Sequence, residues 1–179
     1  MTAQTGAGVS LAISLAAPAS YDADGFGALQ PVTIGEVTNI GSFGREFSTV
    51  THQALDRRGT DKRKGAFNNG AVSPTLALDP SDAGQDAVEA AKERRSPAFF
   101  RVTLQDGLVY WFAGVVMSFR VRVNGADDVV IGTISIEIEP TPIVRYRTVA
   151  GLPGDTFLTI EDLFDATMRR LSETLSAAA

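Results

Sequence analysis

The chain has 179 residues and a formal net charge of −5 at neutral pH, enough sequence for one domain of ordinary size with a hydrophobic core. It contains no cysteine and a single histidine, His52, which excludes disulfides, thiolate metal sites, cysteine nucleophiles and metal sites built on two histidines. The acidic balance argues against a protein that wraps nucleic acid over most of its surface. The sequence has no run of eighteen apolar residues, so no membrane-spanning helix is expected.

Residues 1–31 are mostly small, rich in glycine and alanine, and almost uncharged. Leu11, Ile13 and Leu15 alternate with small residues as in a strand, and no lysine or arginine precedes Arg45, so the positively charged start of a secretory signal is missing. Because this segment has few apolar side chains with which to order itself, we expect an extended N-terminal arm over 1–31 that orders against a partner.

Residues 32–50 are rich in β-branched side chains, interrupted by the turn residues of NIGSFG at 39–44, and this pattern predicts two strands. The segment that follows concentrates basic charge, because eight positions hold five of the sixteen lysines and arginines: Arg57, Arg58, Lys62, Arg63 and Lys64. We expect a long polar hairpin loop here, which is either simply solvated or a contact surface.

A helix is predicted over residues 81–95. Ser81 is a good N-cap, acidic residues come first and basic residues last, and Pro97 lies just beyond the end. The apolar face consists mostly of alanine, so we expect this helix to lie close against a sheet and flank it.

The strongest strand pattern covers residues 98–123. Asp106 and Gly107 separate two alternating apolar runs, which predicts an antiparallel hairpin of 98–105 with 108–123. The first half of the second strand is apolar on both faces, so we expect both faces to be covered there, by the helix or by a neighbouring subunit.

The next strand, at about 129–139, alternates isoleucines with polar residues. An even-numbered turn before it places Arg120 and Arg122 on the same face as Thr133 and Glu137. The two strands therefore predict one continuous apolar face and one polar face, which is basic near the turn and acidic at the end that holds Glu137 and Glu139.

A second helix is predicted over residues 160–175, with an i, i+3, i+4 apolar stripe. We expect this stripe to dock on a sheet or on a neighbouring subunit through Leu163, Phe164, Met168 and Leu171. Together the patterns predict a mainly β (α+β) protein: a mixed β domain with one flanking helix and an appended C-terminal helix. The β domain is expected over 32–150, and 151–179 is expected to be a linker and helix.

No residue set predicts catalysis, a cofactor or a metal ion, so we do not expect an enzyme. His52 is the one candidate general base, but no serine lies in a G-x-S-x-G motif, and a polar strand or loop residue is the simpler interpretation. The carboxylate pairs Asp127 with Asp128 and Glu137 with Glu139 fit a turn and a solvated strand face without a metal.

Six segments occur in an order that resembles a known family. They are VTNIG at 37–41, EFSTVTH at 46–52, KGAFNNG at 64–70, LDPSDAGQ at 78–85, FRVTLQDG at 100–107 and FAGVVMSF at 112–119. Over about residues 33–140 this order is similar to that of the major tail tube proteins of long, flexible-tailed (siphovirus-type) bacteriophages. The resemblance does not extend to the N-terminal arm or to the C-terminal helix.

The resemblance implies a sandwich or barrel of two packed antiparallel sheets with one flanking helix. It also implies a virion structural protein that polymerises as stacked hexameric rings into the tail tube, the conduit through which DNA leaves the capsid for the host. Its implied partners are other copies of the chain, other tail proteins at the tube ends, and the tape-measure protein and DNA inside the lumen without specific binding, with no membrane and no cofactor. The implied location is the virion tail, after assembly in the host cytoplasm. In such proteins the long early loop reaches toward the adjacent ring, and a lumen suited to DNA passage favours the glutamates, Glu137 and Glu139, on its wall.

An alternative from another functional class stays open. The chain could be a monomeric β-sandwich module that grips nucleic-acid phosphates with the five basic residues of 57–64. Salt-sensitive DNA binding by a monomer would favour this alternative.

Overall fold

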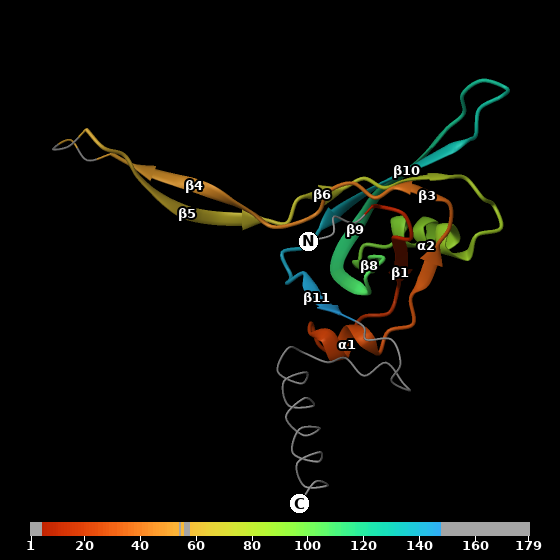
Figure 1. Ribbon diagram of the computed structural model, residues 1–179, viewed down its shortest axis with the longest axis horizontal. Coiled ribbons are helices and arrows are strands. Elements are labelled where there is room, and N and C mark those ends of the chain that lie inside the picture. Colours follow the sequence, from red (N-terminus) through yellow and green to blue (C-terminus); the bar gives the residue numbers. More distant parts are fainter. Residues whose placement is uncertain (1–4, 54, 56–57, 148–179) are drawn as a thin grey trace, which may run out of the picture.

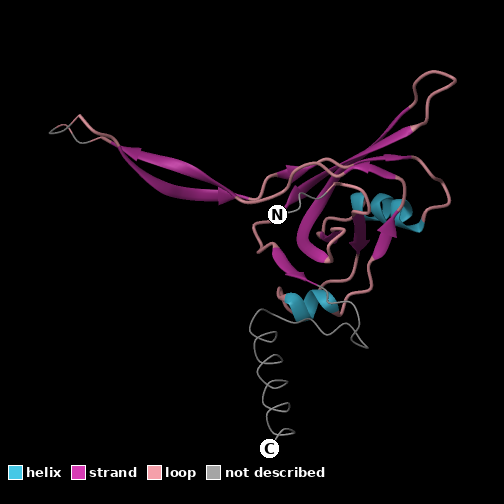
Figure 2. Ribbon diagram, viewed as in Figure 1, coloured by secondary structure: helices cyan, strands magenta, loops and turns pink. Residues whose placement is uncertain are grey.

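Figure 1 shows the computed structural model, which describes residues 5–53, 55 and 58–147. The chain is mainly β, as predicted, with a large curled sheet that forms a half-barrel and a separate two-stranded ribbon (Figure 2). The larger sheet contains β1 (Ser10–Ser14), β2 (Val32–Ile34), β3 (Val37–Asn39), β6 (Ala71–Val72), β7 (Thr75–Ala77), β8 (Ala98–Thr103), β9 (Leu108–Arg122), β10 (Ile131–Ile138) and β11 (Val144–Arg147). The ribbon is formed by β4 (Glu46–His52) and β5 (Asp61–Asn68), and the described helices are α1 (Ala23–Gly27) and α2 (Ala83–Lys92).

The strand β9 is central in the larger sheet. The main strand order is β2-β1-β8-β9-β10-β7-β3, and in addition β11 pairs with β9 and β6 pairs with β10. The predicted hairpin at Asp106 and Gly107 is confirmed, because β8 and β9 pair antiparallel from Ala98 opposite Gly114 to Thr103 opposite Val109. The distal half of β9 extends beyond the body of the domain with β10 (Figure 1).

Both faces of the first half of β9 are covered, as predicted. On one face Phe112 packs in a core cluster to which α2 contributes Val88 and Ala91. On the other face Trp111 packs in a second cluster against Phe26, which belongs to α1. The covering elements are thus two helices of the same chain, and each side of β9 has its own apolar core.

The first helix, α1, is absent from the sequence-based prediction. Two of its five residues are glycines, Gly25 and Gly27, which obscure the apolar periodicity of so short a segment. Its start is nevertheless marked by an N-cap, because the carboxylate of Asp22 accepts a hydrogen bond of 2.8 Å from the Gly25 amide.

The predicted flanking helix is confirmed as α2, but its N-cap is Asp82 and not Ser81. One carboxylate oxygen of Asp82 accepts from the amide of Gln85 at 2.7 Å, and the other accepts from the amide of Gly35 at 3.1 Å. The carboxylate therefore caps the helix and also ties it to the segment after β2, whereas the Ser81 hydroxyl donates to Asp79, two residues earlier in the chain.

The N-terminal segment differs from its expectation. Strand β1 lies inside the larger sheet, between β2 and β8, with Ile13 opposite Phe100 and Leu11 opposite Ile34. Both Leu11 and Ile13 are buried in the core. The expectation of an extended arm that needs a partner is therefore wrong for residues 10–14, because their alternating apolar side chains order against this chain's own core.

The C-terminal helix predicted over 160–175, with Leu163, Phe164, Met168 and Leu171, lies outside the described residues. Within the described part of the chain, neither helix is long and apolar enough to cross a membrane.

Candidate assembly surfaces

The ribbon of β4 and β5 is highly exposed. It is called here the arm, and it is distinct from the N-terminal segment 1–31 discussed above. These two strands pair only with each other, and Figure 1 shows them projecting away from the body. All seven residues of β4 are exposed. Because an isolated two-stranded ribbon is only marginally stable in water, the arm is a natural candidate for contact with another molecule.

One face of the arm has an aromatic base. Phe47 and Phe67 are direct cross-strand partners whose ring centroids lie 6.0 Å apart, and each side chain is 40% exposed. The Lys64 ammonium lies 4.7 Å from the Phe47 ring, and the Arg45 guanidinium lies 4.1 Å from the Phe67 ring. Cations above aromatic faces are favourable even at exposed sites, so this face is apolar and positively charged at once.

The basic residues of 57–64 do not form the loop that the sequence predicts. Lys62, Arg63 and Lys64 lie within β5, since Lys64 pairs with Thr49, Arg63 with Val50 and Lys62 with Thr51. Side chains alternate along a strand, so Lys62 and Lys64 share the aromatic face and Arg63 lies on the opposite face. 

The two remaining basic residues lie toward the distal turn. Arg58 is at the exposed bend, and Arg57 lies outside the described residues. The sequence predicts a hairpin here, but the pairing of β4 with β5 continues as far as His52 and Asp61, much farther than the polar composition suggests.

His52 is at the far end of β4, exposed, in register with Asp61 of β5. Within the described residues no group of three or more His, Cys, Asp or Glu side chains could hold a metal ion.

A buried asparagine joins the arm to the body. The Asn69 amide nitrogen donates to the carbonyl oxygens of Glu139, at 2.6 Å, and Thr141, at 3.0 Å. Its carbonyl oxygen accepts from Nε of Arg45 at 3.1 Å. Both ends of the arm thus meet at one side chain, which fixes them against the segment just after β10, and the sequence analysis assigns no role to Asn69.

The polar face of β9 and β10 has the predicted register. Arg120 pairs with Thr133 and Ser118 pairs with Ser135, and Glu137 lies on the same face, exposed, at the other end of β10. The glutamate two residues on, Glu139, is half-buried. The structure thus brings the basic and acidic ends onto one surface.

The alternation in the sequence predicts that the odd-numbered residues of β9 form one continuous apolar face. The structure shows that this face is interrupted. Ser135 pairs with Ser118 but Ile136 pairs with Val116, so Met117 is an extra residue in β9 and is exposed. This β-bulge moves the core-facing positions from even numbers, such as Val116, to odd numbers, such as Phe119.

Beyond the bulge, the turn between β9 and β10 forms an exposed tip over residues 121–130. Val123 and Val129 are 74% and 65% exposed, and Val121 is also exposed. The turn carries the carboxylates of Asp127 and Asp128, both exposed, and Asp128 accepts a hydrogen bond of 3.1 Å from the Gly125 amide. These exposed valines stand beside carboxylates that form no ion pair within the described residues, and an exposed apolar group of this kind is unusual for a solvated turn.

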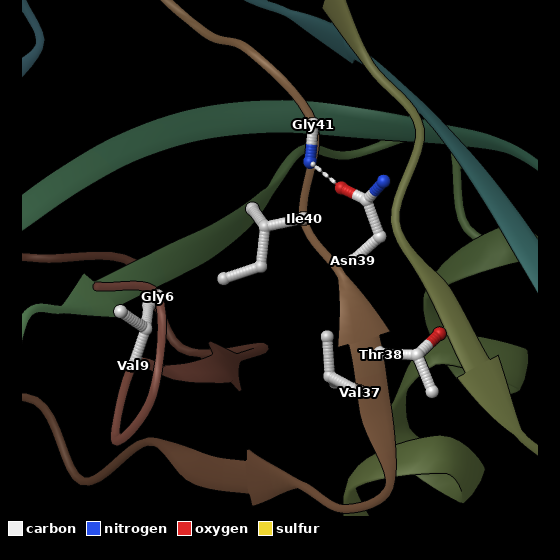
Figure 3. A pocket seen from close by; sticks show the side chains of 7 residues that line it. All are labelled: Gly6, Val9, Val37, Thr38, Asn39, Ile40 and Gly41. Carbon is white, nitrogen blue, oxygen red and sulfur yellow. Dashed lines mark hydrogen bonds between the residues drawn. The ribbon is translucent and has the colours of Figure 1, made fainter.

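Two hollows occur near these surfaces. One, of about 240 Å³, lies beside the outer edge of β3 and is lined by Gly6, Val9, Val37, Thr38, Asn39, Ile40 and Gly41, with the Asn39 side chain accepting from the Gly41 amide at 2.7 Å (Figure 3). Its lining is uncharged and offers no catalytic group. The other, of about 350 Å³, lies at the aromatic base of the arm and is lined by Glu46, Phe47, Ser48, Ala66, Phe67 and Asn68.

Perturbed carboxyl groups lie at turns and helix caps. The Ser20 hydroxyl, followed by the Gly25 amide, donates to Asp22 and holds the pKa of that carboxyl below its usual value. The side chain and amide of Ser81 lower the pKa of Asp79 in the same way. The hydrogen bonds that cause these two pKa shifts stabilise local turns, and they involve neither the arm nor the polar face.

Comparison with known proteins gives likeness in structure alone. No protein-family model and no curated protein matches the sequence. A chain from the tail of an empty gene transfer agent particle, refined with C6 symmetry, has a TM-score of 0.58 and 15% identity and covers 82% of this chain and 100% of that one. A chain from the six-fold symmetrised baseplate of the anti-feeding prophage has a TM-score of 0.59 and 9% identity, with coverage of 80% and 96%.

A chain of the SPP1 tail tube has a TM-score of 0.55 and 12% identity, with coverage of 79% and 77%. At these identities the comparisons show the fold. The chain therefore has a fold that occurs in the tails and tubes of phage-like particles, which confirms the fold implied by the family resemblance.

Proposed function

We propose that this chain is the structural subunit of a tail tube, that it assembles as stacked hexameric rings, and that the tube conducts DNA from capsid to host. The observation that supports this most is the shared fold with the chain from the gene transfer agent tail, which was refined as a helical tail with C6 symmetry. The six-fold symmetrised anti-feeding prophage baseplate supports the same ring order. The partners would be further copies of this chain and the other proteins of a virion tail of the siphovirus type.

The polar face of β9 and β10 is our candidate for the wall of the lumen. Duplex DNA carries one negative charge per about 1.7 Å of its axis, so a wall of repeated cations would hold it and a wall of carboxylates would not. We therefore assign Glu137 and Glu139 to the lumen, and we place Arg120 and Arg122 near carboxylates at a subunit boundary.

The distal part of the arm is our candidate for contact between rings. The candidate residues are the basic ones of 57–64: Arg57, Arg58, Lys62, Arg63 and Lys64. The last three are exposed on β5, in a ribbon that has no second layer among the described residues. A partner surface in the next ring, with acidic groups, would supply the missing layer and neutralise the charge.

The alternative of a nucleic-acid-binding monomer has less support. The strand pairing divides the basic residues, with Lys62 and Lys64 on one face of the arm and Arg63 on the other. A single phosphate backbone could thus meet only part of the cluster at once.

Negative-stain electron microscopy of the concentrated protein tests the proposal. Rings or tubes with six-fold symmetry are expected. A protein that remains monomeric at every concentration and binds DNA in a salt-sensitive way would refute the tube and favour the alternative.

A further inference from the structure

The two hairpins that leave the body of the domain project from opposite sides. In Figure 1 the arm extends to the left of the body, and the tip of β9 and β10 extends to the upper right. The tip of a molecule therefore lies far from its own arm. Two different surfaces on opposite sides of one molecule can join only head to tail between copies, which produces closed rings or helical arrays.

The two surfaces are complementary in apolar character. The hollow at the base of the arm has a volume of about 350 Å³, and its lining combines the rings of Phe47 and Phe67 with Ala66 and with the polar residues Glu46, Ser48 and Asn68. The tip presents Val121, Val123 and Val129, which have no apolar cover in the described chain. Aromatic pockets filled by a compact apolar group are typical centres of protein interfaces.

The two surfaces are also complementary in charge. Lys62, Lys64 and Arg45 lie on the aromatic face of the arm, and none of them forms an ion pair within the described residues. Asp127 and Asp128 at the tip likewise form no ion pair there. The ion pairs of the described chain involve other groups: Lys92 with Glu89 and Glu93, and Arg147 with Asp106.

We infer that the tip at 121–130 of one copy docks in the hollow at the base of the arm of a second copy, with its valines against Phe47 and Phe67 and its aspartates facing Lys62, Lys64 and Arg45. This contact joins neighbours within a ring. It takes Lys62 and Lys64 from the set assigned above to the contact between rings, and it leaves Arg58 and Arg63 for the next ring. It rests on the proposed function in one respect, because it requires that the chain assembles with itself.

Cross-linking tests the inference directly, since the chain has no cysteine of its own. Ala66→Cys places a thiol at the hollow and Val123→Cys places one at the tip, and both positions are exposed. A mixture of the two variants, treated with a short bismaleimide, is expected to give a covalent dimer. The control is Val123→Cys mixed with Ala90→Cys, whose thiol is on the exposed side of α2. The dimer yield of the test mixture is expected to exceed that of the control about tenfold. Tubes with no preferred link between positions 66 and 123 would overturn the inference and leave the proposed function intact, whereas a protein that never assembles would overturn both.

Charge reversal gives an independent test of the same contact. Asp127→Lys with Asp128→Lys is expected to lower the cross-linking yield and the amount of assembled protein by about tenfold, because like charges then face each other. Adding Lys62→Glu and Lys64→Glu in the same chain is expected to restore both. Asp86→Lys with Glu93→Lys on α2 makes the same change in net charge and is the control. A loss of assembly in the control equal to that of the tip variant, or the absence of rescue, would overturn the inference.

Discussion

The indole N–H of Trp111 donates a buried hydrogen bond of 2.9 Å to the hydroxyl oxygen of Tyr146. Trp111 is in the middle of β9 and Tyr146 is in β11, so one polar contact inside the second apolar cluster holds the last described strand against the central strand of the sheet. A buried donor of this kind is satisfied only by that partner, and its loss carries a desolvation cost.

Tyr146→Phe is therefore expected to lower the free energy of unfolding by about 1–3 kcal/mol, because it leaves the Trp111 N–H unsatisfied. Trp111 is the only tryptophan, so its fluorescence during urea unfolding reports on this cluster directly. Tyr110→Phe is the matched control, since the half-buried Tyr110 ring packs edge-on against Phe43. Equal losses in the two variants would show that the hydrogen bond is not what stabilises the cluster.

Helix α2 approaches β2 most closely at Gly84. A Cβ atom at this position would clash with the backbone of Thr33 and Ile34, which has no flexible end that could move aside. Gly84→Ala is expected to cost about 1–3 kcal/mol of stability by pushing the helix away from the sheet. Gly59→Ala, where the added methyl group would meet open space, is expected to change stability by less than about 0.5 kcal/mol in the same thermal or urea unfolding experiment.

The parts of the fold that the sequence predicts correctly are those that depend on local sequence patterns. The turn at Asp106 and Gly107, the helix at 83–92 and the pairing of Arg120 with Thr133 depend on short-range chemistry and on alternation, and all three are confirmed. The β-bulge at Met117 interrupts an alternation that continues without a break in the sequence. Its position is set by how Val116 and Phe119 pack against distant strands, which no local pattern contains.

The assembly surfaces were predicted less completely for a similar physical reason. Charge density identified the basic segment, but a run of lysine and arginine does not reveal that β4 and β5 continue to pair through it. The inner position of β1 was missed because alternation predicts a strand but not its neighbours. Asn69 and the aromatic base of the arm come from contacts between residues more than eighteen positions apart, and only the folded chain brings them together.

Acid is expected to weaken the start of α1 through Asp22. The pKa of this carboxyl is lowered in the folded chain, so its stabilising effect is complete above the ordinary value of 3.8 and is lost as the pH falls through the lower folded value. Asp22→Asn keeps a capping oxygen and removes the titration, so its unfolding midpoint in urea is expected to change less than that of the wild-type chain between about pH 5 and pH 2.5. Asp24→Asn is the control two residues along the chain. Identical pH profiles for the wild type and Asp22→Asn would contradict the prediction.

Removal of the arm is expected to separate folding from assembly. Replacing Glu46–Asn68 with a short Gly-Ser turn leaves Asn69, which donates to backbone carbonyls just after β10, and Arg45, which donates to Asn69, in place. The core clusters contain no residue of the arm, so the free energy of unfolding is expected to remain nearly unchanged while rings and tubes disappear from electron micrographs. Normal tubes from the armless chain would remove the arm from the assembly, and an unfolded product would show that the arm belongs to the core.

The charge of the polar face gives the prediction closest to the proposed conduit. Glu137→Lys with Glu139→Lys is expected to leave tubes intact in electron micrographs, because Glu137 is exposed and Glu139 is held through its backbone. The Glu139 amide donates to the carbonyl oxygen of Ala113, and the Glu139 carbonyl oxygen accepts from Asn69. Particles built from this variant are expected to eject DNA more slowly at low salt than at high salt, because the new cations attract the phosphates and added ions screen that attraction.

The control for this variant is Asp86→Lys with Glu93→Lys, which makes the same change in net charge on the exposed side of α2. If the polar face lines the lumen, only the variant on β10 slows ejection, and the delay shortens as salt rises. Equal rates for both variants at low salt would place the glutamates on another wall of the tube. The stacked-ring proposal would survive that result, since it depends on the fold and on the arm, but the surface along which DNA slides would have to be sought elsewhere on the domain.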